Sequence, residues 1–222
     1  MKSKNRINLS QLDISERYKI LTQLIVPRPI AWVSTVSEEG VTNLAPFSYF
    51  NLFGSKPPLV VVSCGNRPEG GPKDTAANIE ATEVFGINMV SEELADVMVK
   101  SSAPLAPAES EIEKLGLATF EVGEKKVPML DSAQVNMECK LIEIRYYGEN
   151  RLIVGEVLNR MERLPKRIMG ENRLIVGEVL NLFIDDSLID GKELTISPEY
   201  APIGRLGGDF YGTTTNRFEK SR

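Results

Sequence analysis

IAWVSTVSEEGVTNLAPFSYFN, which runs from Ile30 to Asn51, is the stretch that decides the fold. Its first seven residues are rich in β-branched and aromatic side chains, which favour a strand. The turn-like sequence SEEG follows, and the apolar pattern resumes at Val41. The stretch therefore predicts a β-hairpin of two antiparallel strands.

Further strands are predicted on the carboxyl side of this hairpin. Leu59–Cys64 reads LVVVSC, an unbroken apolar run that predicts a strand buried on both faces. Val84–Val90, Val135–Tyr146 and Arg151–Leu158 also have strand-like patterns. Because strands outnumber helices and mostly follow one another directly, we expect a mainly β fold, an antiparallel barrel with peripheral helices.

The helices are expected to be short and peripheral. Ser15–Leu24 has apolar residues at helical spacing, with Ser15 as the expected cap, and Asp74–Ala81 is expected to begin at an Asp74 cap. Another helix is predicted to begin at Ser91. The Pro- and Ala-rich residues 101–117 are predicted to form a loop over the surface.

A perfect repeat interrupts this pattern. GENRLIVGEVLN occupies Gly148–Asn159 and again Gly170–Asn181, an offset of 22 residues. Solenoid repeats are imperfect and more numerous, so residues 148–181 are interpreted as a tandem duplication within a single domain of residues 1–222. We expect one copy in the sheet and the other in an added hairpin or outer loop.

The composition excludes several classes of protein. The chain has 222 residues, of which 42% are hydrophobic and 26% charged, a composition that predicts a globular protein. Its net charge of -5 predicts that it binds neither nucleic acid nor anionic lipid. No apolar run reaches about 18 residues, so no membrane span and a cytoplasmic location are expected. The absence of histidine excludes histidine-based triads and histidine zinc sites, and Cys64 and Cys139 are expected to be buried thiols.

The first candidate site follows the strand LVVVSC. A strand, a Gly-rich turn and a helix N-terminus together form an anion site, and here Lys73 could supply charge while Ser63 and Thr75 donate hydrogen bonds to a monophosphate. The spacing does not fit a nucleotide-binding P-loop, because Lys73 comes two positions late. A plain surface turn with a capped helix is the alternative.

The second candidate is the end of the hairpin, VTNLAPFSYFN, where a flat heteroaromatic ring could lie. Asn43 and Ser48 could contact polar ring edges and ribityl hydroxyls, and the backbone N–H groups of Ala45 and Phe47 could donate to ring carbonyls. The alternative is that the aromatic residues of this segment, and Trp32, belong to the core.

Longer segments carry a family resemblance. PRPIAWVSTVSEEGVTNLAPFSYFN, PPLVVVSCG, GPKDTAANI, FGINMVSEELAD and IGRLGGDFY occur in that order between about Leu21 and Tyr211. Together they resemble the flavin reductase-like FMN-binding split-barrel family, which includes flavoredoxins. The resemblance implies a homodimeric split β-barrel that holds FMN near the subunit boundary and passes electrons from NAD(P)H to flavin.

The resemblance also implies which residues bind the cofactor. Those implied at the ring and ribityl chain are Trp32, Ser34, Thr35, Asn43, Ala45, Pro46, Phe47, Ser48 and Tyr49. Those implied at the phosphate are Ser63, Lys73, Asp74 and Thr75, and Phe210 and Tyr211 could approach a flavin of either subunit.

The implied function needs no catalytic side chain and no metal, because a flavin carries out hydride chemistry itself. We expect an NAD(P)H-dependent FMN reductase or an oxidoreductase with fixed FMN. A non-enzymatic FMN electron carrier with a redox partner protein and a flavin storage or sensing module are the alternatives. Backbone N–H groups of Asn43–Ser48 are expected to stabilise the negative charge of reduced flavin.

Overall fold

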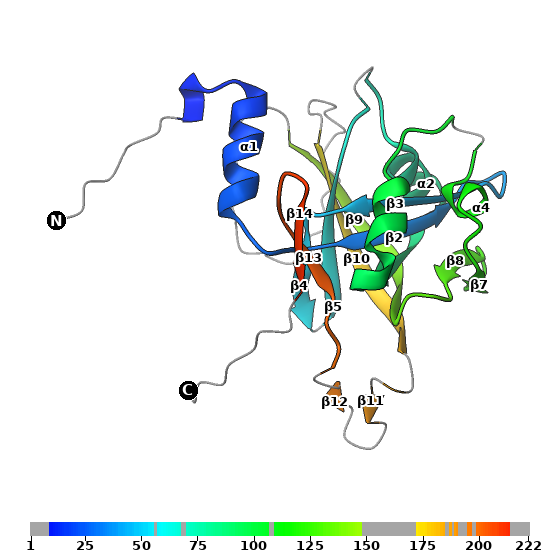
Figure 1. The fold of residues 1–222 in the computed structure, drawn as a ribbon. Helices are drawn as coiled ribbons and strands as arrows, with labels where there is room; N and C mark the ends of the chain where they lie inside the picture. The colour runs from blue at the N-terminus through cyan, green and yellow to red at the C-terminus, as the bar shows by residue number, and fades with distance from the viewer. Residues whose placement is uncertain are drawn as a thin grey trace.

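A seven-stranded antiparallel sheet forms the centre of the molecule, with strand order β3-β2-β6-β9-β10-β5-β4 (Figure 1). The structure, a computed structural model, describes residues 9–55, 57–67, 70–106, 109–147, 172–184, 187, 189–190, 195–196 and 199–213. The strands of the sheet are β2 (Ala31–Val36), β3 (Thr42–Phe47), β4 (Phe50–Ser55), β5 (Pro58–Gly65), β6 (Val84–Met89), β9 (Val135–Tyr147) and β10 (Asn172–Ile184). The prediction of a mainly β, antiparallel fold is confirmed.

Smaller sheets and short helices surround the central sheet. The smaller strands are β1 (Arg28–Pro29), β7 (Thr119–Val122), β8 (Val127–Leu130), β11 (Ile189–Asp190), β12 (Thr195–Ile196), β13 (Ile203–Gly207) and β14 (Phe210–Thr213). The helices are η1 (Leu9–Gln11), α1 (Ile14–Leu24), α2 (Asp74–Thr82), η2 (Glu92–Leu94), α3 (Ala95–Lys100) and α4 (Glu111–Lys114). Among the described residues, no helix is long and apolar enough to cross a membrane.

The predicted hairpin is formed by β2 and β3, which pair from Ala31 with Phe47 to Val36 with Thr42. Every residue of β2 is buried, because alternate side chains enter two different core clusters. Ala31 packs in the cluster that includes residues of α2, while Trp32 packs in the cluster that includes residues of α3 and α4. The hairpin is thus covered on both faces.

Burial on both faces was predicted for β5, and that prediction is wrong. Along β5 buried residues such as Val60 and Val62 alternate with partly exposed ones such as Leu59 and Val61. An apolar run alone does not show which neighbours cover each face of a strand.

Two predicted helix caps are also wrong. Asp13 caps α1 in place of Ser15, because its carboxylate accepts from the Glu16 N–H at 2.8 Å while the Glu16 carboxylate accepts from the Asp13 N–H at 3.0 Å. Lys73 occupies the cap position of α2, and Asp74 is the first helical residue.

The segment from Ser91 begins with the 3-10 turn η2 before α3. Residues 101–117 are not a plain surface loop, because they contain α4 and bury Ser101, Ser110 and Ile112.

The second copy of the duplicated sequence supplies β10 from Asn172 onward. β10 pairs with β9 on one side and with β5 on the other, so the prediction that one copy lies in the sheet is confirmed. The other copy, which includes the predicted strand Arg151–Leu158, lies outside the described residues.

Candidate functional site

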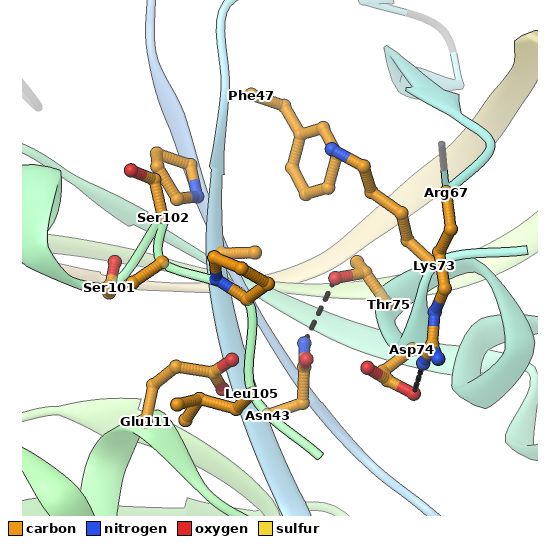
Figure 2. A pocket seen from close by; sticks show the side chains of 14 residues that line it. Asn43, Phe47, Arg67, Lys73, Asp74, Thr75, Ser101, Ser102, Leu105 and Glu111 are labelled. Carbon is orange, nitrogen blue, oxygen red and sulfur yellow. Dashed lines mark hydrogen bonds and ion pairs between the residues drawn. The ribbon is translucent and has the colours of Figure 1, made fainter. Parts of the chain in front are cut away.

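A cavity of about 410 Å³ opens between β3, the N-terminal end of α2 and the segment that leads from α3 to α4 (Figure 2). This volume is in the range of small-molecule sites. The residues that line it are Asn43, Ala45, Pro46, Phe47, Arg67, Lys73, Asp74, Thr75, Ser101, Ser102, Ala103, Pro104, Leu105 and Glu111. Both candidate segments from the sequence therefore border one cavity.

A buried hydrogen-bond network joins the two segments. The Asn43 side-chain Nδ2 donates to Thr75 Oγ1 at 2.9 Å, across the space between β3 and α2 (Figure 2). Asn43 Nδ2 also lies 3.3 Å from Thr35 Oγ1, which accepts a hydrogen bond from Asn78 Nδ2 at 3.1 Å. Because Thr75 Oγ1 is the acceptor in its hydrogen bond with Asn43, the Thr75 O–H is not used in that bond.

One end of the cavity is rich in cationic and donor groups. Arg67 forms an ion pair with Asp74, and the Lys73 Nζ lies 5.8 Å from the centre of the Phe47 ring. Lys73 has no ion-pair partner within the part of the chain that the structure describes. The first N–H groups of the nine-residue helix α2 have no acceptor inside the helix, as at every helix N-terminus. This end of the cavity favours an anion.

The outer edge of β3 is closed by α4. The Leu44 N–H donates to Glu111 Oε2 at 2.9 Å, and the Thr42 and Ser110 hydroxyl oxygens lie 2.6 Å apart. Pro46 has no N–H to offer at this edge. β3, an edge strand of the sheet, is thereby protected against further pairing.

This arrangement corrects one sequence-based expectation. Successive N–H groups of a strand point in opposite directions, and the Leu44 N–H points away from β2. The N–H groups of Ala45 and Phe47 consequently point toward their partners in β2. These two N–H groups are therefore not available to donate to a ligand. Ala45 and Phe47 can contact a ligand only through atoms other than the backbone N–H.

Burial raises the pKa of Glu111, and the nearby Asp74 charge adds to this effect. The hydrogen bond from the Leu44 N–H acts in the opposite direction but does not cancel it. Glu111 therefore holds its proton to a higher pH than an exposed glutamate does.

A second cavity of about 290 Å³ adjoins the first, with which it shares Pro46, Phe47, Lys73 and Ser102. Its other lining residues are Ile30, Ser48, Met98, Val99, Arg205, Asp209 and Tyr211. Ser48 and Tyr211, both implied by the family resemblance, thus lie at this neighbouring cavity.

Three implied residues lie behind the wall of the first cavity. Trp32, Ser34 and Thr35 each have 0% of their surface exposed. The Trp32 Nε1 donates to the Ser101 hydroxyl at 2.8 Å, so Trp32 holds a lining residue from the core side. Ser34 accepts a hydrogen bond from Asn88 Nδ2 at 3.2 Å, within the buried network between β2 and β6.

Three further implied residues line neither cavity. Tyr49 is 45% exposed, and Phe210 is 75% exposed. Ser63 lies on β5, where its N–H donates to the Tyr49 carbonyl at 2.8 Å. Arg67 and Glu111, which line the cavity, were not predicted. Arg67 lies in the Gly-rich loop that the sequence had already singled out, whereas no pattern pointed to Glu111.

Comparison with known proteins agrees with this fold. The family model described as flavin reductase like domain matches residues 23–195. The chain therefore belongs to the flavin reductase-like family, and it is a flavin-related protein of the oxidoreductase class. A split barrel domain protein from Shewanella frigidimarina shares the fold, with a TM-score of 0.74 at 21% identity over 96% of this chain and 95% of that one. The predicted split-barrel fold is confirmed.

More similar proteins cover nearly the whole chain. An uncharacterized protein of Aquifex aeolicus is 36% identical over 91% of this chain and 92% of its own length. The 2-nitrobenzoate 2-nitroreductase of Pseudomonas fluorescens is 30% identical, with a TM-score of 0.81 over 98% and 96% of the two chains. Component B of nitrilotriacetate monooxygenase from Bacillus cereus is also 30% identical, with a TM-score of 0.85 over 99% and 100%.

Proposed function

We propose that this protein is an FMN-dependent oxidoreductase that binds FMN in the cavity between β3 and α2. The observation that carries the proposal is the hydrogen bond from Asn43 to Thr75, because it holds the expected ring segment and the expected phosphate segment at one cavity. To bind both ends of one FMN molecule, a protein must bring the ring segment and the phosphate segment to the same cavity.

The residues present fit the two ends of FMN. Lys73, Arg67, the Thr75 hydroxyl and the N–H groups at the start of α2 suit a phosphate. Arg67 pairs with Asp74 and so offsets the carboxylate that would repel that phosphate, and Lys73 supplies the positive charge beyond this pair. Ala45, Pro46, Phe47 and Leu105 give the other part of the cavity the apolar surface that a flat ring requires.

The bound flavin would supply the hydride chemistry, and the chain would bind, orient and tune it. Asn43 is held by two threonine hydroxyls, so its amide has a fixed position at the wall. Glu111 fixes the edge of β3 through the Leu44 N–H.

NAD(P)H is the proposed electron donor. The 2-nitroreductase and the monooxygenase component among the similar structures support an enzyme over a non-enzymatic carrier. The first test is a titration with FMN, monitored by flavin fluorescence. The second test measures the oxidation of NADH and of NADPH, with and without excess FMN. Turnover without added flavin indicates a fixed cofactor, and turnover that needs it indicates a flavin reductase. FMN binding without turnover would favour the carrier, and failure to bind FMN would refute the proposal.

We also propose that the protein is a homodimer. Leu52 and Phe53 on the edge strand β4 are 68% and 64% exposed, and Leu59 and Val61 on the neighbouring β5 are only partly buried. Large apolar side chains that are exposed on an edge strand favour contact with a second copy. By light scattering, the wild-type protein should be a dimer and the Phe53→Asp variant a monomer. A monomeric wild-type protein would refute the proposal.

A further inference from the structure

The second cavity has the features of a binding site for a small anionic molecule. It adjoins the proposed FMN cavity along Phe47 and Lys73, so its occupant would lie beside the flavin. Ile30 and Met98 give it an apolar wall, whereas Ser48 and Arg205 bring hydrogen-bond donors. An apolar wall with a few convergent donors is the usual composition of a small-molecule site.

Arg205 is held in place by the β13–β14 hairpin. Its Nε and Nη2 donate to the Gly208 carbonyl at 3.3 and 3.1 Å, and its Cζ lies 5.9 Å from the centre of the Tyr211 ring. Gly207 and Gly208 have φ values of 105° and 53°, which permit the tight turn that brings this carbonyl back to Arg205. The guanidinium is thus positioned before any ligand arrives, which lowers the entropic cost of binding.

These contacts leave part of the Arg205 guanidinium free. The two hydrogen bonds use the single N–H of Nε and one N–H of Nη2, so both N–H groups of Nη1 and the second one of Nη2 remain for a ligand. Across the described residues, Arg205 has no carboxylate partner at ion-pair distance. Asp209 lines the same cavity but does not neutralise Arg205. A free guanidinium in a cavity favours a planar oxyanion that it can bind with two parallel hydrogen bonds.

We propose that this second cavity binds the reactant that exchanges electrons with the flavin, and that Arg205 binds the oxyanion group of that reactant. The inference rests on the proposed function, since it needs FMN in the adjoining cavity. A carboxylate of an aromatic acceptor and a phosphate of a dinucleotide donor share this chemistry. Arg205 is a specificity residue in either case, because it selects reactants that carry a negative charge.

The test compares matched ligands by calorimetric titration of the protein saturated with oxidised FMN. One pair is 2-nitrobenzoate and 2-nitrobenzamide, and the other is nicotinamide mononucleotide and nicotinamide riboside, so the members of each pair differ in one oxyanion. Arg205→Gln should weaken binding of at least one anionic ligand by about tenfold or more. Its uncharged or phosphate-free counterpart should change by less than about twofold. Loss confined to 2-nitrobenzoate identifies a carboxylate site, and loss confined to nicotinamide mononucleotide identifies a phosphate site.

Three control variants make the result specific. Arg145→Gln removes an arginine that lines neither cavity and should change no affinity. Arg205→Lys keeps the charge but not the planar fork, and it should retain part of the affinity. Asp209→Asn should leave anion binding unchanged or strengthen it, because a carboxylate on the same wall repels an anion. Weaker anion binding in Asp209→Asn would contradict the proposal.

The outcomes separate this inference from the proposed function. Failure of the unchanged protein to bind FMN refutes the proposed function, and the same titrations on the flavin-free protein then still decide whether Arg205 binds an oxyanion. Normal FMN binding with equal ligand affinities for the unchanged protein and Arg205→Gln overturns the inference alone. So does an unchanged protein that binds neither anionic ligand.

Discussion

Lys73→Gln should weaken FMN binding while it leaves riboflavin binding nearly unchanged, because riboflavin lacks the phosphate. Hydrogen bonds to charged groups contribute about 1.5 to 3 kcal/mol. Lys73 is exposed, so solvent screens its charge and the lower end applies. A loss of about 1.5 kcal/mol corresponds to roughly a tenfold increase in the Kd for FMN.

The assay is quenching of flavin fluorescence, with FMN and riboflavin titrated against the same preparations. Lys126→Gln, which removes an exposed lysine that does not line this cavity, is the matched control and should change neither Kd. Added salt should weaken FMN binding to the unchanged protein more than binding to Lys73→Gln. An equal loss for FMN and riboflavin would place Lys73 away from the phosphate, and no loss for either would remove it from the site.

Two other predictions concern stability. The pKa of Glu111 is raised in the folded protein, so its contribution to stability is fully present below the unfolded pKa and is lost as pH rises through the folded pKa. The free energy of unfolding in urea should therefore rise for Glu111→Gln relative to the wild-type protein as the pH increases from 4 to 7. A difference between the two proteins that does not change with pH would contradict this. Deleting residues 148–169 should leave the free energy of unfolding unchanged or raise it, because a shorter connection between the paired ends of β9 and β10 costs less entropy to close. A deletion variant that unfolds more readily would contradict it.

The positions of the strands in the sequence could be predicted more completely than the burial of their faces. The β2–β3 hairpin follows from side-chain pattern and turn sequence, which are local properties of the chain. The burial of β5 depends on which elements cover each face, and the apolar run of Leu59–Cys64 carries no such information. The N-cap of α1 was predicted incorrectly for a similar reason. Both Asp13 and Ser15 are residue types that cap helices, and only the capping box between Asp13 and Glu16 decides between them.

The site shows the same division between local and long-range information. Lys73 and Thr75 could be predicted because a strand, a Gly-rich loop and a helix follow one another in sequence. Glu111 could not be predicted, because its position depends on a hydrogen bond to Leu44, far away in the chain. Trp32 matches the family motif, yet it lies in the core and reaches the cavity only through Ser101. A motif thus indicates a region of the site, and packing decides which of its side chains touch the ligand.

The register of β9 and β10 explains why the deletion should be tolerated. Tyr147 pairs with Asn172, so residues 148–171 together connect the two strands at their paired ends. After removal of residues 148–169, Gly170 and Glu171 alone would join these partners. A two-residue loop with glycine first is typical of the type II′ turn, which matches the twist of an antiparallel hairpin. Both edges of β10 are already paired, with β9 and β5, so this part of the sheet has a place for one copy of the repeated sequence. The pairings of β10 with β9 and β5 therefore do not require a second copy of the repeated sequence.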